Sequence, residues 1–185
     1  MSMYSFALCL HIMGAVGMFT GLGIEGIVYT NLNNASTSFQ VLAWGNSMKA
    51  IRIVFAVSTL LLLIPGLYLV IESWGWTSWV ISGLVLLVGL SGYGSTTGKK
   101  IVTAMKSLNR NEESLPDDFK NRIAGLSLLK SYKIKITLAL GIIFIMTIKP
   151  GWVGSIVTTV AAFAIGFLLN LPFGVKEQVK ELESA

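Results

Sequence analysis

The sequence predicts an all-α fold, a polytopic membrane helix bundle with five transmembrane helices, its N-terminus outside the cell and its C-terminus in the cytoplasm. Hydrophobic residues make up 54% of the 185 residues and charged residues only 12%, about half the charged share of a soluble domain. Five long apolar stretches each approach the roughly 20 residues that cross the hydrocarbon core of a bilayer. We therefore expect lipid, and not water, to surround the folded chain.

The first two helices are predicted over residues 4–32 and 49–73, where apolar side chains run almost without interruption. The first helix ends in the polar stretch 31–36. Pro65 and Gly66 interrupt the second helix near its middle. Because proline has no backbone N–H, this pair predicts a kink.

The third helix is predicted over residues 78–108. Its last part is basic and amphipathic, so it should leave the bilayer and form one arm of a cytoplasmic helical hairpin over 99–133. The other arm begins the fourth helix, predicted over 115–148, because Ser114 opens a Ser-x-x-Asp pattern with proline in the first turn.

The fifth helix is predicted over residues 154–171, and Pro172 ends it. The chain contains no visible internal repeat. Residues 1–185 are therefore predicted to form a single transmembrane domain.

The distribution of positive charge predicts the orientation. Every Lys and Arg except Lys149 falls on the side of the bilayer that carries the hairpin and the C-terminal tail, and positive residues favour the cytoplasmic side. Four tryptophans, Trp74, Trp76, Trp79 and Trp152, then gather at the opposite interface as an aromatic belt. The expected location is the cell (inner) membrane, with anionic lipid headgroups as partners of the basic residues. Nucleic acid is not expected as a partner, because the basic residues lie at the ends of apolar stretches.

Two ionisable residues lie within the first apolar stretch, and such residues are functional candidates by default. His11 and Glu25 are fourteen residues apart, which places them within about 40° of one another on a helix. The same face carries Gly14, Met18 and a Gly-x-x-x-Gly spacing that lets another helix approach closely. Both ionisable side chains should therefore point into the bundle.

Glu25 is predicted to form an ion pair with Arg52, which should lie at a similar depth at the cytoplasmic start of the second helix. Two interpretations remain open. The pair either locks the first two helices together, or it forms a charged gate or proton site in the cytoplasmic half.

His11 is the single histidine of the chain. It cannot supply the three or four Cys and His ligands of a structural zinc site, so no metal site is predicted. It can serve as one axial ligand of a haem, with water, Met13 or Met18 opposite, or in a dimer that shares the cofactor. The alternative is a core histidine that is hydrogen-bonded at the level of Tyr68.

Two short motifs suggest a family. The stretch Leu10–Ala15 and the run Leu62–Leu69, with an arginine opening the second helix, resemble a group of uncharacterised bacterial integral membrane proteins similar to the copper-resistance-D-like and HemJ-type families. The resemblance covers about the first 110 residues. In HemJ-type proteins a histidine of an early helix binds haem, and by resemblance this role falls on His11. The other histidines of such relatives are absent here, so the resemblance implies neither their copper transport nor their enzymatic activity.

Two hypotheses about function follow from these residues. In the first, the protein is a haem- or porphyrin-associated redox or binding protein in which Gly14, Met18 and Tyr68 surround a ring held by His11. In the second, it is a small transporter or proton-linked permeation protein that uses Glu25 and Arg52. A further alternative is an accessory subunit, with a second copy of the chain or a larger membrane complex as its partner. No catalytic motif is visible in the sequence, so an enzyme is not favoured.

Overall fold

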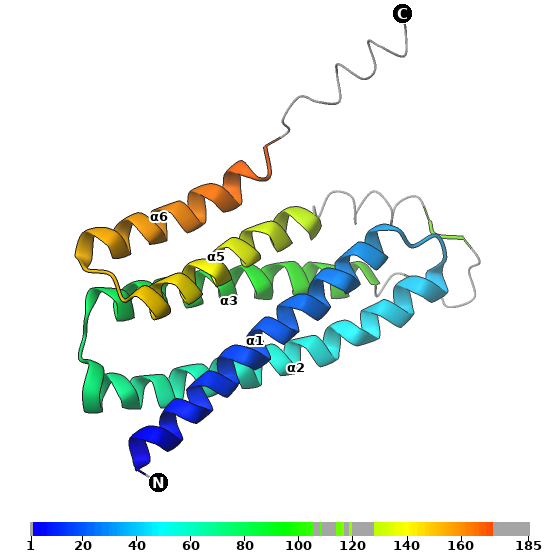
Figure 1. Ribbon diagram of the computed structural model, residues 1–185. Helices are drawn as coiled ribbons and strands as arrows, with labels where there is room; N and C mark the ends of the chain where they lie inside the picture. Colours follow the sequence, from blue (N-terminus) through cyan, green and yellow to red (C-terminus); the bar gives the residue numbers. More distant parts are fainter. Residues whose placement is uncertain (1, 106–107, 109–113, 117–118, 120–127, 172–185) are drawn as a thin grey trace, which may run out of the picture.

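The computed structural model describes residues 2–105, 108, 114–116, 119 and 128–171, with the side chains of 94–100 excepted. The described part is helical throughout its regular structure. Its elements are α1 (Met3–Asn33), α2 (Ser38–Leu69), the π-helical turn η1 (Val70–Trp74), α3 (Ser78–Met105), α5 (Leu128–Ile148) and α6 (Trp152–Leu168). The helices run up and down along one bundle axis (Figure 1). The all-α prediction is confirmed for the described residues.

Helices α1 and α2 form a tight hairpin because small residues let their backbones meet. A Cβ atom added to Gly14 would lie 2.8 Å from the backbone carbon of Leu61, and one added to Gly17 would collide with the hydroxyl of Ser58. Side chains cap both helices: the hydroxyl of Ser2 begins α1 and that of Thr37 begins α2. The glycine face predicted for helix packing is thus the face that α2 covers.

Helix α2 continues through Pro65 and widens into η1 before Gly75 ends it with a positive φ of 67°. Proline within a helix deprives the carbonyl four residues earlier of its donor. Wide π-helical turns are one way in which a helix accommodates such a disturbance.

The other three helices, α3, α5 and α6, form a second group. Gly141 of α5 meets Ala162 of α6, and a Cβ atom on Gly166 of α6 would lie 2.6 Å from the hydroxyl oxygen of Thr137. Between α5 and α6, the carbonyl of Pro150 accepts hydrogen bonds from Ser78 at 3.1 Å and Ser155 at 3.0 Å. The two groups of helices meet mainly where α1 faces α5 and where α2 faces α3.

Helix boundaries agree with the sequence at most ends and differ at two. The second helix begins at Ser38 and not near residue 49, because Val41, Gly45 and Met48 continue its buried face and Met105 of α3 packs on Gly45. Of the fourth helix, the structure describes α5 (Leu128–Ile148) and a helical Phe119, whereas Leu115 and Pro116, at the predicted start, are not helical. About half of the predicted hairpin over 99–133, including 109–113 and 120–127, lies outside the described residues.

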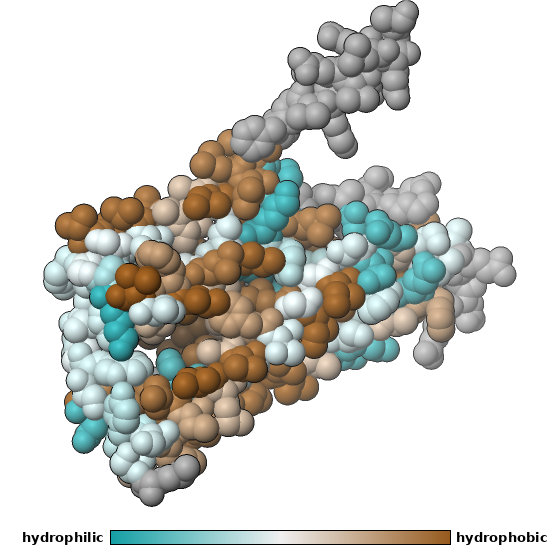
Figure 2. All heavy atoms as spheres, in the orientation of Figure 1, coloured by the Kyte–Doolittle hydropathy of each residue, from teal (hydrophilic) through white to brown (hydrophobic). Residues whose placement is uncertain are grey.

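Within the described residues, three helical segments are long and apolar enough to cross a membrane: Met3–Asn33, Ser38–Trp74 and Leu128–Ile148. Two shorter apolar helices, Ser78–Tyr93 and Trp152–Leu168, accompany them. Large apolar side chains such as Ile71, Val88 and Val153 are at least 70% exposed, and brown, hydrophobic atoms cover much of the surface in Figure 2. A water-soluble protein rarely exposes so much apolar surface, so these features indicate a membrane protein.

Candidate functional site: a cavity at His11 and a buried ion pair

The two groups of helices leave a cavity between them. It has a volume of about 560 Å³ and is lined by side chains of α1, α2 with η1, α3 and α5. Ligand sites in proteins commonly have volumes of about 300 to 1,000 Å³. Figure 2 shows this face of the molecule hollowed between α1 and α5.

The lining of the cavity is almost entirely apolar. Among the described residues that line it, the polar side chains are His11, Thr20, Trp74 and Thr147. Both threonine hydroxyls donate to carbonyls of their own helices, Thr20 to Val16 at 2.9 Å and Thr147 to Ile143 at 2.7 Å. A ligand in the cavity would therefore meet the imidazole of His11, the indole of Trp74 and two threonine oxygens that can only accept a hydrogen bond.

His11 is held in place by α2. Its Nδ1 atom lies 2.9 Å from the carbonyl oxygen of Leu62, and its ring packs on Gly66, where an added Cβ atom would lie 3.0 Å from the imidazole. Because a carbonyl oxygen can only accept, Nδ1 must carry the proton of this hydrogen bond. In the neutral imidazole Nε2 then keeps its lone pair, which is the arrangement of histidines that bind a metal through Nε2. The Pro65–Gly66 interruption thus provides the surface on which the ring rests.

Trp74 lies beside His11, and Trp79 and Lys149 lie beside Trp74. The ring of Trp74 meets that of His11 edge to face, with centroids 6.0 Å apart, and Trp79 lies 5.3 Å from Trp74. The ammonium of Lys149 lies 5.6 Å from the centroid of Trp74 and 5.2 Å from that of Trp79, within the range of cation–π attraction. We call this end of the molecule, with Trp74, Trp79 and Lys149, the tryptophan end.

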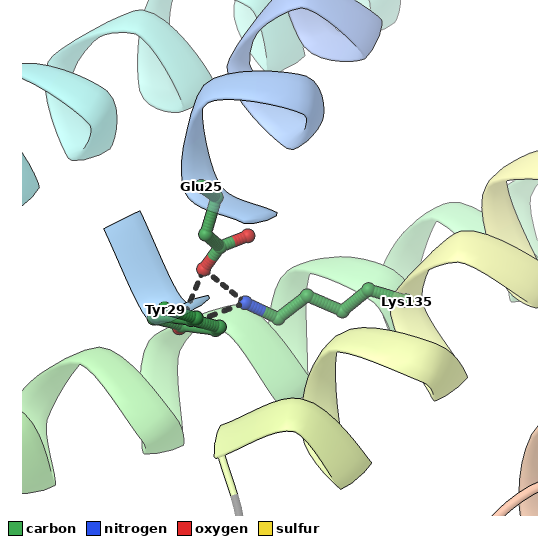
Figure 3. Close-up of polar contacts among 3 residues, drawn as sticks. All are labelled: Glu25, Tyr29 and Lys135. Carbon is green, nitrogen blue, oxygen red and sulfur yellow. Dashed lines mark hydrogen bonds and ion pairs between the residues drawn. The ribbon is translucent and has the colours of Figure 1, made fainter. Parts of the chain in front are cut away.

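Toward the opposite end, α1 and α5 are joined by buried charges (Figure 3). The ammonium of Lys135 lies 2.5 Å from Oε1 of Glu25, and the hydroxyl of Tyr29 donates to the same oxygen at 2.6 Å. Lys135 is 1% exposed and Glu25 is 4% exposed. Oε2 of Glu25 is buried and has no hydrogen-bond partner among the described residues. The pair is therefore enclosed and only partly satisfied.

The predicted pair between Glu25 and Arg52 is wrong. Glu25 pairs with Lys135 of α5, and Arg52 is exposed on α2. The reason is local packing. Gly26 has no side chain, so the ring of Tyr132 lies against it and brings α5 to α1 at the level of Glu25.

The sequence contained a signal for Lys135 that the positive-charge count concealed. The charge count places Lys135 among the positive residues of the cytoplasmic side, yet it lies seven residues after Leu128 and seven before Ile142, on the buried face of α5. A lysine on an apolar helical face requires an acidic partner. Glu25 is an acidic residue within an apolar stretch, so the sequence offered Lys135 as a second candidate partner beside Arg52.

The other residues predicted for the site are distributed as follows. Met18 lines the cavity together with His11. Gly14 faces the backbone of α2, so a flat ring cannot rest on the glycine face as expected. Tyr68 is half-buried on α2 and is not among the described residues that line the cavity.

Comparison of the chain with protein-family models, with curated proteins and with solved structures finds no match.

Proposed function

We propose that the protein crosses the cell (inner) membrane five times, with its N-terminus outside and its C-terminus in the cytoplasm. The alternating direction of α1, α2, α3, α5 and α6 along one axis supports five spans. The tryptophan end supports an outer interface at the start of α1, since tryptophan is enriched at membrane interfaces. Lys130 and Lys133 lie at the start of α5, at the other end, in agreement with a cytoplasmic location there.

Within this topology the protein binds a small, uncharged and largely apolar ligand in the cavity between the two groups of helices. The observation that carries this proposal is an apolar cavity of about 560 Å³ in which His11 is held by the carbonyl of Leu62. A fixed tautomer presents a single lone pair, at Nε2, and such a group confers orientation and specificity in an otherwise apolar site.

A haem or another porphyrin, which the sequence suggests, is one candidate ligand. The Nδ1–H bond from His11 to Leu62 suits an axial ligand, and Met18 in the same cavity offers a sulfur atom. When bound, a haem would supply one-electron redox chemistry. The described lining contains no cation to pair with the ring carboxylates of a haem, so a neutral ligand fits the cavity better.

Binding can be tested with 1-aminoanthracene, a neutral aromatic fluorophore, added to the protein in lipid nanodiscs. We expect energy transfer from the tryptophans near the cavity, above the level of protein-free nanodiscs. Ala15 lines the cavity, so Ala15→Phe should abolish the transfer by filling the space, whereas Ala164→Phe on the exposed face of α6 should preserve it. Equal binding by the two variants would rule out this cavity as the site. An absorption spectrum with a Soret band that disappears in His11→Ala would identify haem as the ligand.

Proton-linked permeation is a second candidate, favoured by the buried pair of Glu25 and Lys135. Ionisable groups buried in membrane helices often belong to proton or ion pathways. This pair joins the two groups of helices on the side of the cavity that faces away from the tryptophan end. This function requires a pH-dependent proton flux into liposomes that contain the protein. The variant Glu25→Gln should abolish that flux. Wild-type flux in the Glu25→Gln protein would exclude it.

A further inference from the structure

The cavity is bordered on one side by exposed residues. Along α1, Ile12, Val16 and Thr20 line it at intervals of one helical turn, and along α5 Ile143 and Thr147 do the same. All five residues are exposed, with Val16 at 62% and Ile143 at 43%. These residues form the rims of a slot between α1 and α5, which we call the α1/α5 slot. The hollow between these helices in Figure 2 lies along this border.

A sideways opening between two membrane helices faces acyl chains and not water. The rims of the α1/α5 slot carry aliphatic side chains, and their two hydroxyls are bonded to their own helices. From Ile12 to Thr20 the slot extends about 12 Å along α1, at a rise of about 1.5 Å per residue. Its dimensions and chemistry suit a hydrocarbon chain that lies parallel to the helices.

At the inner wall, His11 selects the group at the head of such a chain. Because Nδ1 donates to Leu62, Nε2 of the neutral imidazole can only accept a hydrogen bond. The fitting partner is a hydrogen-bond donor, and a hydroxyl group is the simplest one on an uncharged amphiphile. The neighbouring ring of Trp74, which also lines the cavity, provides an aromatic surface beside that position.

We propose that the ligand of this cavity is a membrane-dissolved amphiphile with a hydroxyl-bearing aromatic head, and that it enters from the bilayer through the α1/α5 slot. The hydroxyl donates to Nε2 of His11, the ring lies beside Trp74, and the chain lies between Val16 and Ile143. This inference rests on the proposed binding function and specifies its ligand class and its route of entry.

The single histidine makes the proposal measurable. In protein labelled with ¹⁵N-histidine and placed in nanodiscs, Nδ1 and Nε2 of His11 give the only imidazole signals. We would add 4-nonylphenol, its methyl ether or unsubstituted phenol, and express each concentration as a mole fraction in the bilayer. The phenol with a chain should shift the Nε2 signal, and the methyl ether, which has no hydrogen to donate, should not. Unsubstituted phenol should need an about tenfold higher mole fraction, since it lacks the contacts of the chain.

Variants at the slot test whether the chain of the ligand lies there, as entry from the bilayer through the slot requires. Val16→Trp should raise the half-saturating mole fraction of 4-nonylphenol by about tenfold or more through occlusion of the slot, and the smaller change Val16→Phe should have an intermediate effect. The matched control is Val157→Trp, on the exposed face of α6, which should behave as the wild type. An unchanged Nδ1 signal would verify that each variant retains the bond to Leu62.

Three kinds of outcome would overturn the inference, and they differ in meaning. If phenol and 4-nonylphenol shift Nε2 at equal mole fractions, or if Val16→Trp has no effect, the chain does not occupy the slot and the binding function alone survives. If none of the three compounds moves the Nε2 signal and 1-aminoanthracene also fails to bind, the binding function fails as well. A shift by the methyl ether equal to that of 4-nonylphenol would refute the hydroxyl contact.

Discussion

Removing one member of the Glu25–Lys135 pair should destabilise the protein far more than removing both. In Glu25→Gln the ammonium of Lys135 loses its counter-ion, with the hydroxyl of Tyr29 as its remaining neighbour at 3.5 Å. In Lys135→Met the carboxylate of Glu25 keeps a hydrogen bond from Tyr29 at 2.6 Å and loses its cation. Each single variant therefore leaves one charge unpaired in the interior.

The burial of the two residues determines the expected magnitude. An exposed ion pair contributes about 0 to 1 kcal/mol, but the side chains here are 2% and 5% exposed. Breaking such a buried pair costs about 3 to 5 kcal/mol, whereas replacing both partners with neutral groups is often close to neutral. We therefore expect each single variant to lower the free energy of unfolding by about 3 to 5 kcal/mol. The free energy of unfolding of the double variant, Glu25→Gln with Lys135→Met, should lie within about 1.5 kcal/mol of the wild-type value. The reason is that the amide oxygen of the glutamine can still accept the hydrogen bond from the hydroxyl of Tyr29.

The assay is unfolding in mixed micelles by titration with sodium dodecyl sulfate, followed by tryptophan fluorescence. Lys133→Met is the matched control, because Lys133 is exposed and donates to the carbonyl of Leu169 at 3.1 Å. Its cost should be about 1 kcal/mol or less. Acid should partly rescue Lys135→Met, since protonation of Glu25 removes the unpaired charge. If the costs of the single variants simply add in the double variant, the two residues are not coupled and the pairing is incorrect.

Three further predictions concern the corrected contacts, the packing of the hairpin and the topology. Arg52→Leu should leave the free energy of unfolding in mixed micelles unchanged within about 0.5 kcal/mol, because Arg52 is exposed and does not pair with Glu25; a loss comparable to that of Glu25→Gln would restore the rejected pair. Gly14→Ala should cost about 1 to 3 kcal/mol in the same titration, since its Cβ would meet the backbone of α2, while Gly23→Ala has open space and should cost nothing; equal effects would contradict the close crossing of α1 and α2. In a cysteine-free background, an impermeant maleimide should label Gly151→Cys in intact cells and Asn34→Cys only after permeabilisation, and the reverse pattern would invert the proposed orientation.

Much of the fold could be predicted from the sequence because hydropathy accumulates along a single helix. The first helix was expected over residues 4–32 and lies at Met3–Asn33, and the last was expected over 154–171 and lies at Trp152–Leu168. Apolar length, proline positions and polar ends are properties of consecutive residues. The start of α2 was missed because only four residues at that end, Ser38, Val41, Gly45 and Met48, are buried. One of them, Gly45, packs on Met105 of α3, which is far away in the sequence.

Partners across the bundle were beyond the reach of the sequence. Periodicity correctly placed Glu25 on an inward face, but it could not say whether Arg52 or Lys135 lay opposite. That choice depends on which helices are neighbours at a given depth, and here the missing side chain of Gly26 admits Tyr132 and with it α5.

The sequence by itself determined that this is a helical protein built for a membrane, and it singled out His11 and Glu25 as the polar residues to explain. The tertiary structure decided that α2 covers the glycine face, that His11 borders an apolar cavity, and that Lys135 neutralises Glu25. The physical reason is that solvent preference is a sum over consecutive residues, whereas a cavity or an ion pair exists only when separate helices meet at matching depths and angles.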